Sequence, residues 1–330
     1  VKEVRKVNVF ELFGKIGINN KPANKAIDET TGKAEGAHSK LSVIFGKIGN
    51  LAVKAGKVMA TGLAIGITAI SSLTGAAVKN YAEYEQLVGG IETLFGAGGK
   101  SLEEYAQSVG KSVDDASSEY KKLINAQEDL LNKSKIAYKT AGLSANEYME
   151  TATSFSASLI QSVKGDTEKA AKLADQAIID MSDNANKMGS SMESIQNAYQ
   201  GFAKQNYTML DNLKLGFGGT KEEMQRLLDE AGKISGVKYD ISSFADITEA
   251  IHVMQVKMGI AGTTSKEAAS TISGSIGMVK ATWQNFLTGM SDPEQDFGEL
   301  INSLTESIGI ALGNIIPKLV QALPRVVKGL

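Results

Sequence analysis

Residues 113–140, with the sequence VDDASSEYKKLINAQEDLLNKSKIAYKT, decide the fold class. They are rich in Ala, Leu, Lys, Glu and Gln, which favour helices, and they predict one long charged helix. Residues 167–188, TEKAAKLADQAIIDMSDNANKM, predict a second helix. We therefore expect an all-α protein. The apolar and small residues of the second helix share one face: Ala170, Leu173, Ala177, Ile178 and Met181.

In the rest of the chain, the placement of prolines and of helix-capping residues is typical of a helical protein. The four prolines are at positions 22, 293, 317 and 324, so none falls between residues 23 and 292. Helix starts are marked by the pattern Ser/Thr-x-x-Glu, in which each side chain caps a backbone N–H of the other residue. Asp292 followed by Pro293 predicts one further start. The capping pairs are Ser101 with Glu104, Ser144 with Glu147, Ser190 with Glu193, Thr220 with Glu223, and Thr264 with Glu267.

Residues 58–78, VMATGLAIGITAISSLTGAAV, carry no charge over 21 positions. A helix of that length can span a bilayer, but five hydroxyl side chains lower its hydrophobicity, and a buried core helix remains an alternative. An apolar stripe with heptad-like spacing enters the segment from upstream, so we predict a long N-terminal apolar, coiled-coil helix over residues 37–80. Glycines four residues apart allow close contact between helices, and we expect self-association. The heptad seam is Leu41, Ile44, Ile48 and Leu51, and the self-association and membrane residues are Gly62, Ile65, Gly66, Ala69, Ser71 and Gly75.

Charge is unevenly distributed along the chain. Residues 1–57 hold eleven Lys or Arg against five Asp or Glu, a net charge of +6, whereas the whole chain carries −2. Lys40, Lys47 and Lys54 are seven residues apart and therefore share one outer face of the expected helix. A basic segment followed by an apolar one favours proximity to phosphates, either of lipid headgroups or of nucleic acid.

Few residues are available for catalysis. The chain has no cysteine, which excludes disulfides, thiol nucleophiles and Cys-based zinc sites. His38 and His252 are the only histidines, and Glu249 lies three residues before His252 on an expected helix, within reach of a contact. One histidine without a second ligand nearby is a poor metal or catalytic site. We therefore predict no enzyme activity, no cofactor and no metal.

Two glycine-rich stretches look like phosphate-binding loops. LFGAGGKS (residues 94–101) has Leu94 where that loop requires glycine, and it follows a helical pattern rather than a strand. GFGGTKEE (residues 216–223) lacks the required glycine spacing. We expect both to be connections between helices, with Ser101 and Thr220 as the next caps. Further along the chain, Trp283, Phe286 and Met290 are expected to anchor the core.

Four longer stretches carry a family resemblance. They are SLTGAAVKNYAEYEQLVGGIETLFG, AYKTAGLSANEYMETATSFSASLI, the run from GDTEKAAKLADQ to GFGGTKEEMQRLL, and TISGSIGMVKATWQNFLTG. In order and texture they resemble phage tail tape measure proteins, especially those of long-tailed phages and prophages of Gram-positive bacteria. The resemblance covers roughly residues 60–290.

The resemblance implies a helical protein that occupies the lumen of the tail tube in the virion, sets tail length and is ejected ahead of the DNA to help it cross the host membrane. The implied partners are other copies of the chain, in a homo-oligomeric bundle such as a trimer, tail tube and tail tip proteins, tail assembly chaperones and the host membrane, with DNA nearby only. The chain would reside in the host cytoplasm during assembly and in the host membrane after ejection. The helical rise of about 1.5 Å per residue independently suits a ruler.

Two other functions share parts of this pattern. A helical pore-forming toxin would use residues 58–78 as its inserting segment. A cell-wall hydrolase would need a pair of acidic residues, and nothing in the sequence singles one out.

We expect four regions in the chain. Residues 1–36 form a basic lead-in segment, residues 37–80 the long helix and residues 81–292 a multi-helix domain. Residues 293–330 begin an apolar region punctuated by prolines, which we expect to continue beyond residue 330.

Overall fold

The computed structural model describes residues 69–292 and 295–329, and it describes side chains for residues 76–292 and 295–318. All of them belong to one compact unit of the chain, Ile67–Leu330. The regular elements of the described residues are all helices and include no strand, which confirms the all-α prediction and the multi-helix domain. Most of the predicted long helix over residues 37–80 lies outside the described residues, and its last part begins α3.

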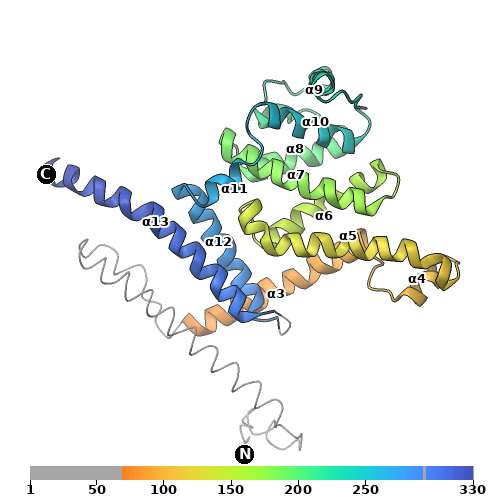
Figure 1. Cartoon of the computed structure of the whole chain (residues 1–330), viewed down its shortest axis with the longest axis horizontal. Coiled ribbons are helices and arrows are strands. Elements are labelled where there is room, and N and C mark those ends of the chain that lie inside the picture. Colours follow the sequence, from red (N-terminus) through yellow and green to blue (C-terminus); the bar gives the residue numbers. More distant parts are fainter. Residues whose placement is uncertain (1–68, 293–294, 330) are drawn as a thin grey trace, which may run out of the picture. The chain divides into compact units, whose positions relative to one another are not determined.

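The helices follow one another with short connections (Figure 1). The two helices that decided the fold class, α5 and α7, have the bounds that the sequence predicts. In chain order the elements are α3 (Ala69–Leu94), α4 (Leu102–Ser108), α5 (Val113–Thr140), α6 (Ala145–Ser162), α7 (Thr167–Met188), α8 (Met192–Ala203), the 3-10 turn η1 (Leu210–Leu213), α9 (Lys221–Ser235), α10 (Phe244–Lys257), α11 (Thr263–Ala268), α12 (Ile272–Gly289) and α13 (Phe297–Gly329).

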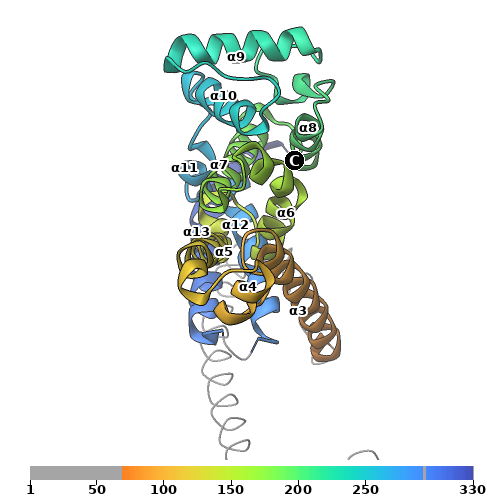
Figure 2. The same ribbon diagram turned by 90° about the vertical axis from the view of Figure 1, so that its right-hand side faces the viewer.

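Helices α5 to α10 form a stack that we call the helical body. Helix α9 packs on α10, α10 on α7, and α7 on both α5 and α6 (Figure 2). One hydrophobic core runs through the body and reaches the end of α3. Burial of its large side chains stabilises the fold at about 1.5–3 kcal/mol each. Those with almost no exposed surface include Tyr148, Tyr199, Phe95, Phe202, Leu130, Leu159, Ile178 and Met181.

Helices α12 and α13 form a second feature, which we call the hairpin. The two pack along each other, and α12 also contacts α3. Their attachment to α5 is small and includes Tyr138, Met278 and Ala281. Within the hairpin, the buried hydroxyls of Thr282 and Ser307 are 2.7 Å apart and hydrogen-bonded. The hairpin therefore combines this hydrogen bond with apolar contacts, among them Phe286 against Phe297 with ring centroids 5.5 Å apart and the buried Ile301 and Leu304.

Three of the predicted helix starts are confirmed. Ser101 and Ser144 form complete capping boxes at α4 and α6. Thr220 accepts the N–H of Glu223 at the start of α9. The carboxylate of Glu223 accepts the N–H of Gly218 instead of the N–H of Thr220, so this cap is not reciprocal.

Two other predicted pairs are wrong. The cap of α8 is Ser191, whose hydroxyl accepts the N–H of Ser194, whereas the Ser190 hydroxyl donates to the carbonyl of Asn212. Helix α11 starts after Gly262 without a cap from its own side chains. The Thr264 N–H donates to a carboxylate from α7 rather than forming a capping box with Glu267.

The start of α13 also lies later than predicted. The first turn is capped by Asp296, which accepts the N–H groups of Gly298 and Glu299, whereas Asp292 precedes the helix by several residues. An aspartate four residues later competes for the same role, and local pattern alone cannot rank the two. The prolines at positions 317 and 324 lie inside α13.

The expectation of a core tryptophan is wrong. Phe286 on α12 is 8% exposed, whereas Trp283 and Met290 are each 39% exposed. Trp283 stacks on Phe286 with ring centroids 5.6 Å apart, so it covers the hairpin from outside.

Candidate functional site

Most of the predicted self-association residues lie outside the described residues: Leu41, Ile44, Ile48, Leu51, Gly62, Ile65 and Gly66. Ala69, Ser71 and Gly75 fall in the first turns of α3, where the backbone alone is described. Self-association through these residues stays a prediction. In the part of the chain that the structure describes, no helix has both the length and the hydropathy needed to cross a membrane.

The glycine-rich stretch at residues 94–101 is a helix connection, as predicted. Helix α3 ends at Leu94, and Ser101 caps α4. Gly98 and Gly99 have φ values of 66° and 72°, a conformation that disfavours residues with a side chain. The two glycines therefore allow the backbone to turn between α3 and α4.

The stretch at residues 216–223 is also a helix connection. A side chain at Gly219 would collide with the backbone of Thr208, so glycine is required for this close approach of two segments. Because that space is filled by protein backbone, the local chemistry favours a packing role over phosphate binding.

The first candidate site is a buried carboxylate paired with His252. The Nδ1 of His252 on α10 donates to Asp180 on α7, at 2.9 Å from Oδ1. Gln176 donates to the same oxygen at 3.1 Å. Asp180 is fully buried, whereas the side chain of His252 is 33% exposed. The sequence suggested a contact between His252 and Glu249, and the structure gives His252 a partner from a different helix.

The pair has perturbed protonation. Burial raises the pKa of Asp180, although the hydrogen bond from His252 opposes this effect. The hydrogen bond to Asp180 raises the pKa of His252, and partial burial opposes it. The hydrogen bond between His252 and Asp180 therefore clamps α10 to α7.

A pocket of about 230 Å³ opens beside His252 and is lined by Glu249, Thr248 and Tyr239. The Thr248 hydroxyl donates to the carbonyl of Ala245, and the Tyr239 hydroxyl donates to Ser235. A histidine oriented by a carboxylate can act as a general base. Both hydroxyls of this pocket already donate hydrogen bonds within the protein, so the arrangement favours a structural clamp.

A second buried carboxylate lies one turn further along α7. Asp183 has no exposed surface and accepts the N–H groups of Gly262 and Thr264, the latter at 2.7 Å. It therefore caps α11 from another helix and ties the chain leaving the helical body to α7. No group of three or more His, Cys, Asp or Glu side chains in the described ranges is arranged to hold a metal ion.

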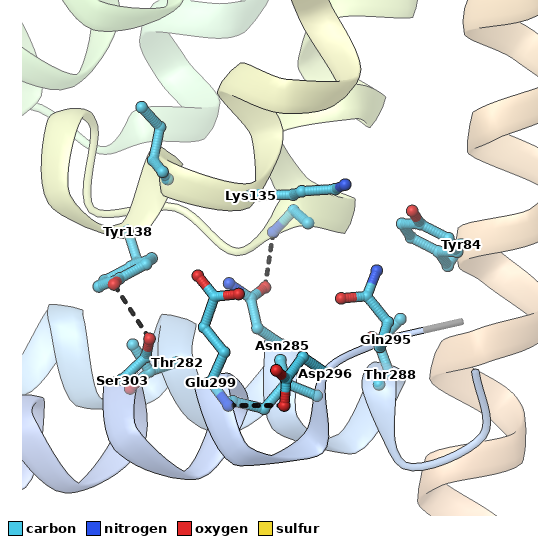
Figure 3. Close-up of a pocket in the computed structure, with 14 residues that line it drawn as sticks. Tyr84, Lys135, Tyr138, Thr282, Asn285, Thr288, Gln295, Asp296, Glu299 and Ser303 are labelled. Atoms are coloured by element: carbon cyan, nitrogen blue, oxygen red, sulfur yellow. Dashed lines mark hydrogen bonds between the residues drawn. The ribbon is translucent and has the colours of Figure 1, made fainter. Parts of the chain in front are cut away.

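The second candidate site lies at the base of the hairpin (Figure 3). A hollow of about 100 Å³ is lined by Tyr84 of α3, by residues of α5 and by the first turn of α13. Tyr138 of α5 donates to Ser303 of α13 at 3.2 Å, and Asn285 of α12 accepts the N–H of Ala145 at 2.8 Å. These two hydrogen bonds attach the hairpin to the helical body.

A neighbouring hollow continues along α3 and shares Tyr84 and Lys135 with the first. We call the two together the acidic cleft. The described lining residues include five carboxylates and one cation, Lys135. The carboxylates are Glu85, Glu92, Asp292, Asp296 and Glu299. Such a cleft can bind a cationic segment by charge.

Sequence reasoning missed both sites. Asp180 and Asp183 interrupt the apolar face of α7, and acidic residues three apart on such a face are the signal that could have revealed them. The acidic cleft joins residues more than 200 positions apart, and no local pattern marks it. No family model, curated protein or solved structure matches this chain.

Proposed function

We propose that this chain is part of a phage tail tape measure protein, a structural ruler in the tail tube lumen that is ejected to help DNA cross the host membrane. The proposal begins from the resemblance of four stretches across roughly residues 60–290.

The observation that carries the proposal is the pairing of a compact body with long helices at either end of the described residues. Helix α13 has 33 residues and is therefore about 50 Å long, and α3 has 26 residues, or about 39 Å. The helices of the body turn back on one another and add little length per residue. A ruler of this design would take its length from such long helices.

The described chemistry supports a structural role rather than turnover. The Asp180–His252 pair bridges two helices, and the hydroxyls beside it already donate elsewhere. We accordingly propose no catalytic activity. The proposed partners are other copies of the chain, tail tube and tip proteins, assembly chaperones and, after ejection, the host membrane.

The test is a set of in-frame changes in the phage gene that encodes this chain. Deleting 14 residues from α13, two heptads, should shorten the protein by about 21 Å, and deleting seven should shorten it by half as much. Tail lengths measured by electron microscopy should fall in that order. Replacing the same 14 residues with an unrelated helical sequence of equal length should restore the tail. Unchanged length in the deletions would contradict a ruler.

A separate assay distinguishes the pore-forming alternative. Purified chain is added to dye-loaded liposomes in the absence of any tail component. The tape measure proposal expects no release under these conditions. Release at low protein concentration would favour a toxin.

A further inference from the structure

We propose that the hairpin packs face to face on the hairpin of a second copy, so that α12 and α13 of the two copies form an antiparallel four-helix bundle around a twofold axis. The inference stands apart from the proposed function, because it concerns the chain alone in solution. It identifies an interaction surface among the described residues, whereas the predicted glycine contacts lie in another part of the chain.

An apolar stripe lies open along one side of α12. Ile276 is 52% exposed, and Ile272, Trp283 and Met290 are each 39% exposed. Lys280 is the only charged residue between positions 271 and 290. Exposed aromatic and apolar side chains with little charge are typical of the centre of a protein interface. The stripe has the spacing of a coiled-coil seam and consists of Ile272, Ile276, Val279, Trp283, Phe286 and Met290.

A second apolar stripe runs along α13, which packs beside α12 (Figure 1). Its members also recur at spacings of three and four residues, so they share one side of the helix. They are Phe297, Ile301, Leu304, Ile308, Leu312 and Ile315. Ile301 and Leu304 are buried, whereas the other members are half-buried.

The two stripes meet at a stack of aromatic rings. The ring of Phe286 lies 5.6 Å from that of Trp283 and 5.5 Å from that of Phe297, measured between centroids. Both stripes therefore belong to one two-helix surface, which we call the hairpin face. A helix pair with an apolar face of this kind is stabilised by packing on another such pair.

Each stripe has the same spacing in both directions. The steps along α12 are 4, 3, 4, 3 and 4 residues, and those from Ile301 to Ile315 on α13 are 3, 4, 4 and 3. An antiparallel second copy presents the same spacing, so each stripe is complementary to itself, as a twofold contact requires. The midpoint of the α12 stripe is position 281, and that of the α13 stripe is Ile308.

One twofold axis serves both helices. The hydroxyls of Thr282 and Ser307 are 2.7 Å apart, so positions 281 and 308 of the antiparallel helices lie at the same level of the hairpin. The midpoints of the two stripes therefore coincide. A partner with a different sequence would not require this symmetry, whereas a second copy does, and the coincidence favours a second copy.

The charge of the hairpin face also suits a second copy. A twofold contact brings identical residues together near the axis, so a strongly charged face would repel itself. Lys280 lies at the edge of the α12 stripe, and its Nζ is 3.8 Å from Glu147 of α6, which offsets part of its charge.

The size of the face predicts a weak dimer. Helix α12 has 18 residues and is about 27 Å long, so two helices, each about 10 Å wide, cover about 540 Å². Standard interfaces bury about 800 Å² on each partner. We therefore expect the dimer to form at micromolar rather than nanomolar concentrations.

The first test uses the absence of native cysteine in the full chain. Position 280 is one residue from the axis, so two Lys280→Cys thiols would be separated by about 3 Å along the helices. Ser273 is exposed on the same helix but is eight residues from the axis, so its two copies would be about 24 Å apart in that direction.

A short bismaleimide should therefore link Lys280→Cys chains into dimers at least tenfold more efficiently than Ser273→Cys chains. Both chains are compared at the same micromolar concentration. Equal yields would overturn the antiparallel contact, because a parallel or random contact brings both positions together. Absence of a dimer from Lys280→Cys would also overturn it.

A second test uses Trp283, which is the only tryptophan of the chain. Its emission should move to shorter wavelength as the protein concentration is raised through the micromolar range, because the dimer covers its ring. Ile276→Glu places a charge on the hairpin face and should abolish this shift. Val256→Glu is the matched control, since Val256 is 55% exposed on α10, and it should leave the shift unchanged.

Thermal melting followed by circular dichroism confirms that both variants are folded. A shift that persists in Ile276→Glu would contradict the proposal. So would emission from the unchanged chain that is independent of concentration but moves when lipid vesicles are added, because that result assigns the face to a membrane surface.

Discussion

The helical body and the hairpin are both helical, but the body buries far more apolar side chains than the hairpin. The body buries Tyr, Phe, Leu, Ile and Met in one continuous core. The hairpin meets α5 through a small cluster, and it buries a shorter set of its own side chains, which includes Phe286, Leu304 and the hydrogen-bonded Thr282 and Ser307. Buried apolar area supplies most of the free energy of folding, whereas a hydrogen bond adds only about 0.5–1.5 kcal/mol. We therefore expect the body to be the stable part and the hairpin to open separately.

The largest expected effect comes from truncating an aromatic side chain in the body. Phe202 is 1% exposed, and its ring lies 5.9 Å from Tyr199 and 6.4 Å from Tyr207, measured between centroids. Phe202→Ala should lower the free energy of unfolding by about 3–5 kcal/mol because it leaves a cavity. Urea unfolding measures the loss. Trp283→Ala in the hairpin is the comparison and should cost less, about 1–2 kcal/mol, since Trp283 is already 39% exposed and its removal leaves no enclosed cavity. Equal losses of unfolding free energy in the two variants would contradict the proposed difference between the body and the hairpin.

A smaller effect is expected where the body meets α11. Asp183→Ala leaves the N–H groups of Gly262 and Thr264 without their carboxylate, which should cost about 2–3 kcal/mol. Asp166 performs the same capping role at the exposed start of α7, so Asp166→Ala should cost about 1 kcal/mol. Thermal unfolding of both variants gives the comparison. A loss at Asp183 no greater than that at Asp166 would show that water replaces the buried cap.

Within the hairpin, a single polar change should act locally. Ser307→Ala removes the hydrogen bond to Thr282 and should destabilise the hairpin by about 1 kcal/mol. Amide exchange in α13 should accelerate about fivefold, which is the rate change that this loss of free energy implies, while exchange in α7 stays unchanged. Asn302 is exposed on the same helix, so Asn302→Ala serves as the neutral control. Acceleration throughout the body would mean that the two regions unfold together.

The smallest expected effect is a pH dependence of the body. The pKa of His252 is raised in the folded state, so its contribution is complete below the unfolded pKa of about 6.5 and is lost as pH rises through the folded pKa. The pKa of Asp180 is also raised, and its contribution changes with pH in the same direction. Asp183 and Glu249 are the other acidic groups near His252.

Melting temperature should therefore fall as pH rises from about 6 to about 9. His252→Asn keeps a neutral hydrogen-bond donor toward Asp180, and its melting temperature should vary less over the same range. If the variant shows the same slope as the unchanged chain, another group is responsible.

Features that depend on neighbouring residues could be predicted from the sequence, whereas contacts between residues far apart in the chain could not. The bounds of α5 and α7 and the caps Ser101 and Ser144 follow from residues within a few positions of each other, and they were predicted correctly. The partner of His252 lies 72 residues away, so local pattern could not identify it.

The same reasoning explains the errors. Helix α11 is capped by Asp183, about 80 residues away, and the Thr264 pair was wrong because a buried carboxylate satisfied the same N–H. Trp283 was expected in the core, but the face it occupies depends on where α13 and α3 pack against α12. Side-chain type predicts a preference for burial, and only packing decides which face is covered.

Native-state hydrogen exchange of the full chain tests the central claim most directly. Amides in the middle of α7, such as those of Ile178 and Met181, should exchange only through global unfolding. Amides of α13 beyond Ala311 should exchange at least about 100-fold faster, through separate opening of the hairpin. Equal protection in the two regions, with the same dependence on denaturant, would show a single cooperative unit and contradict this account.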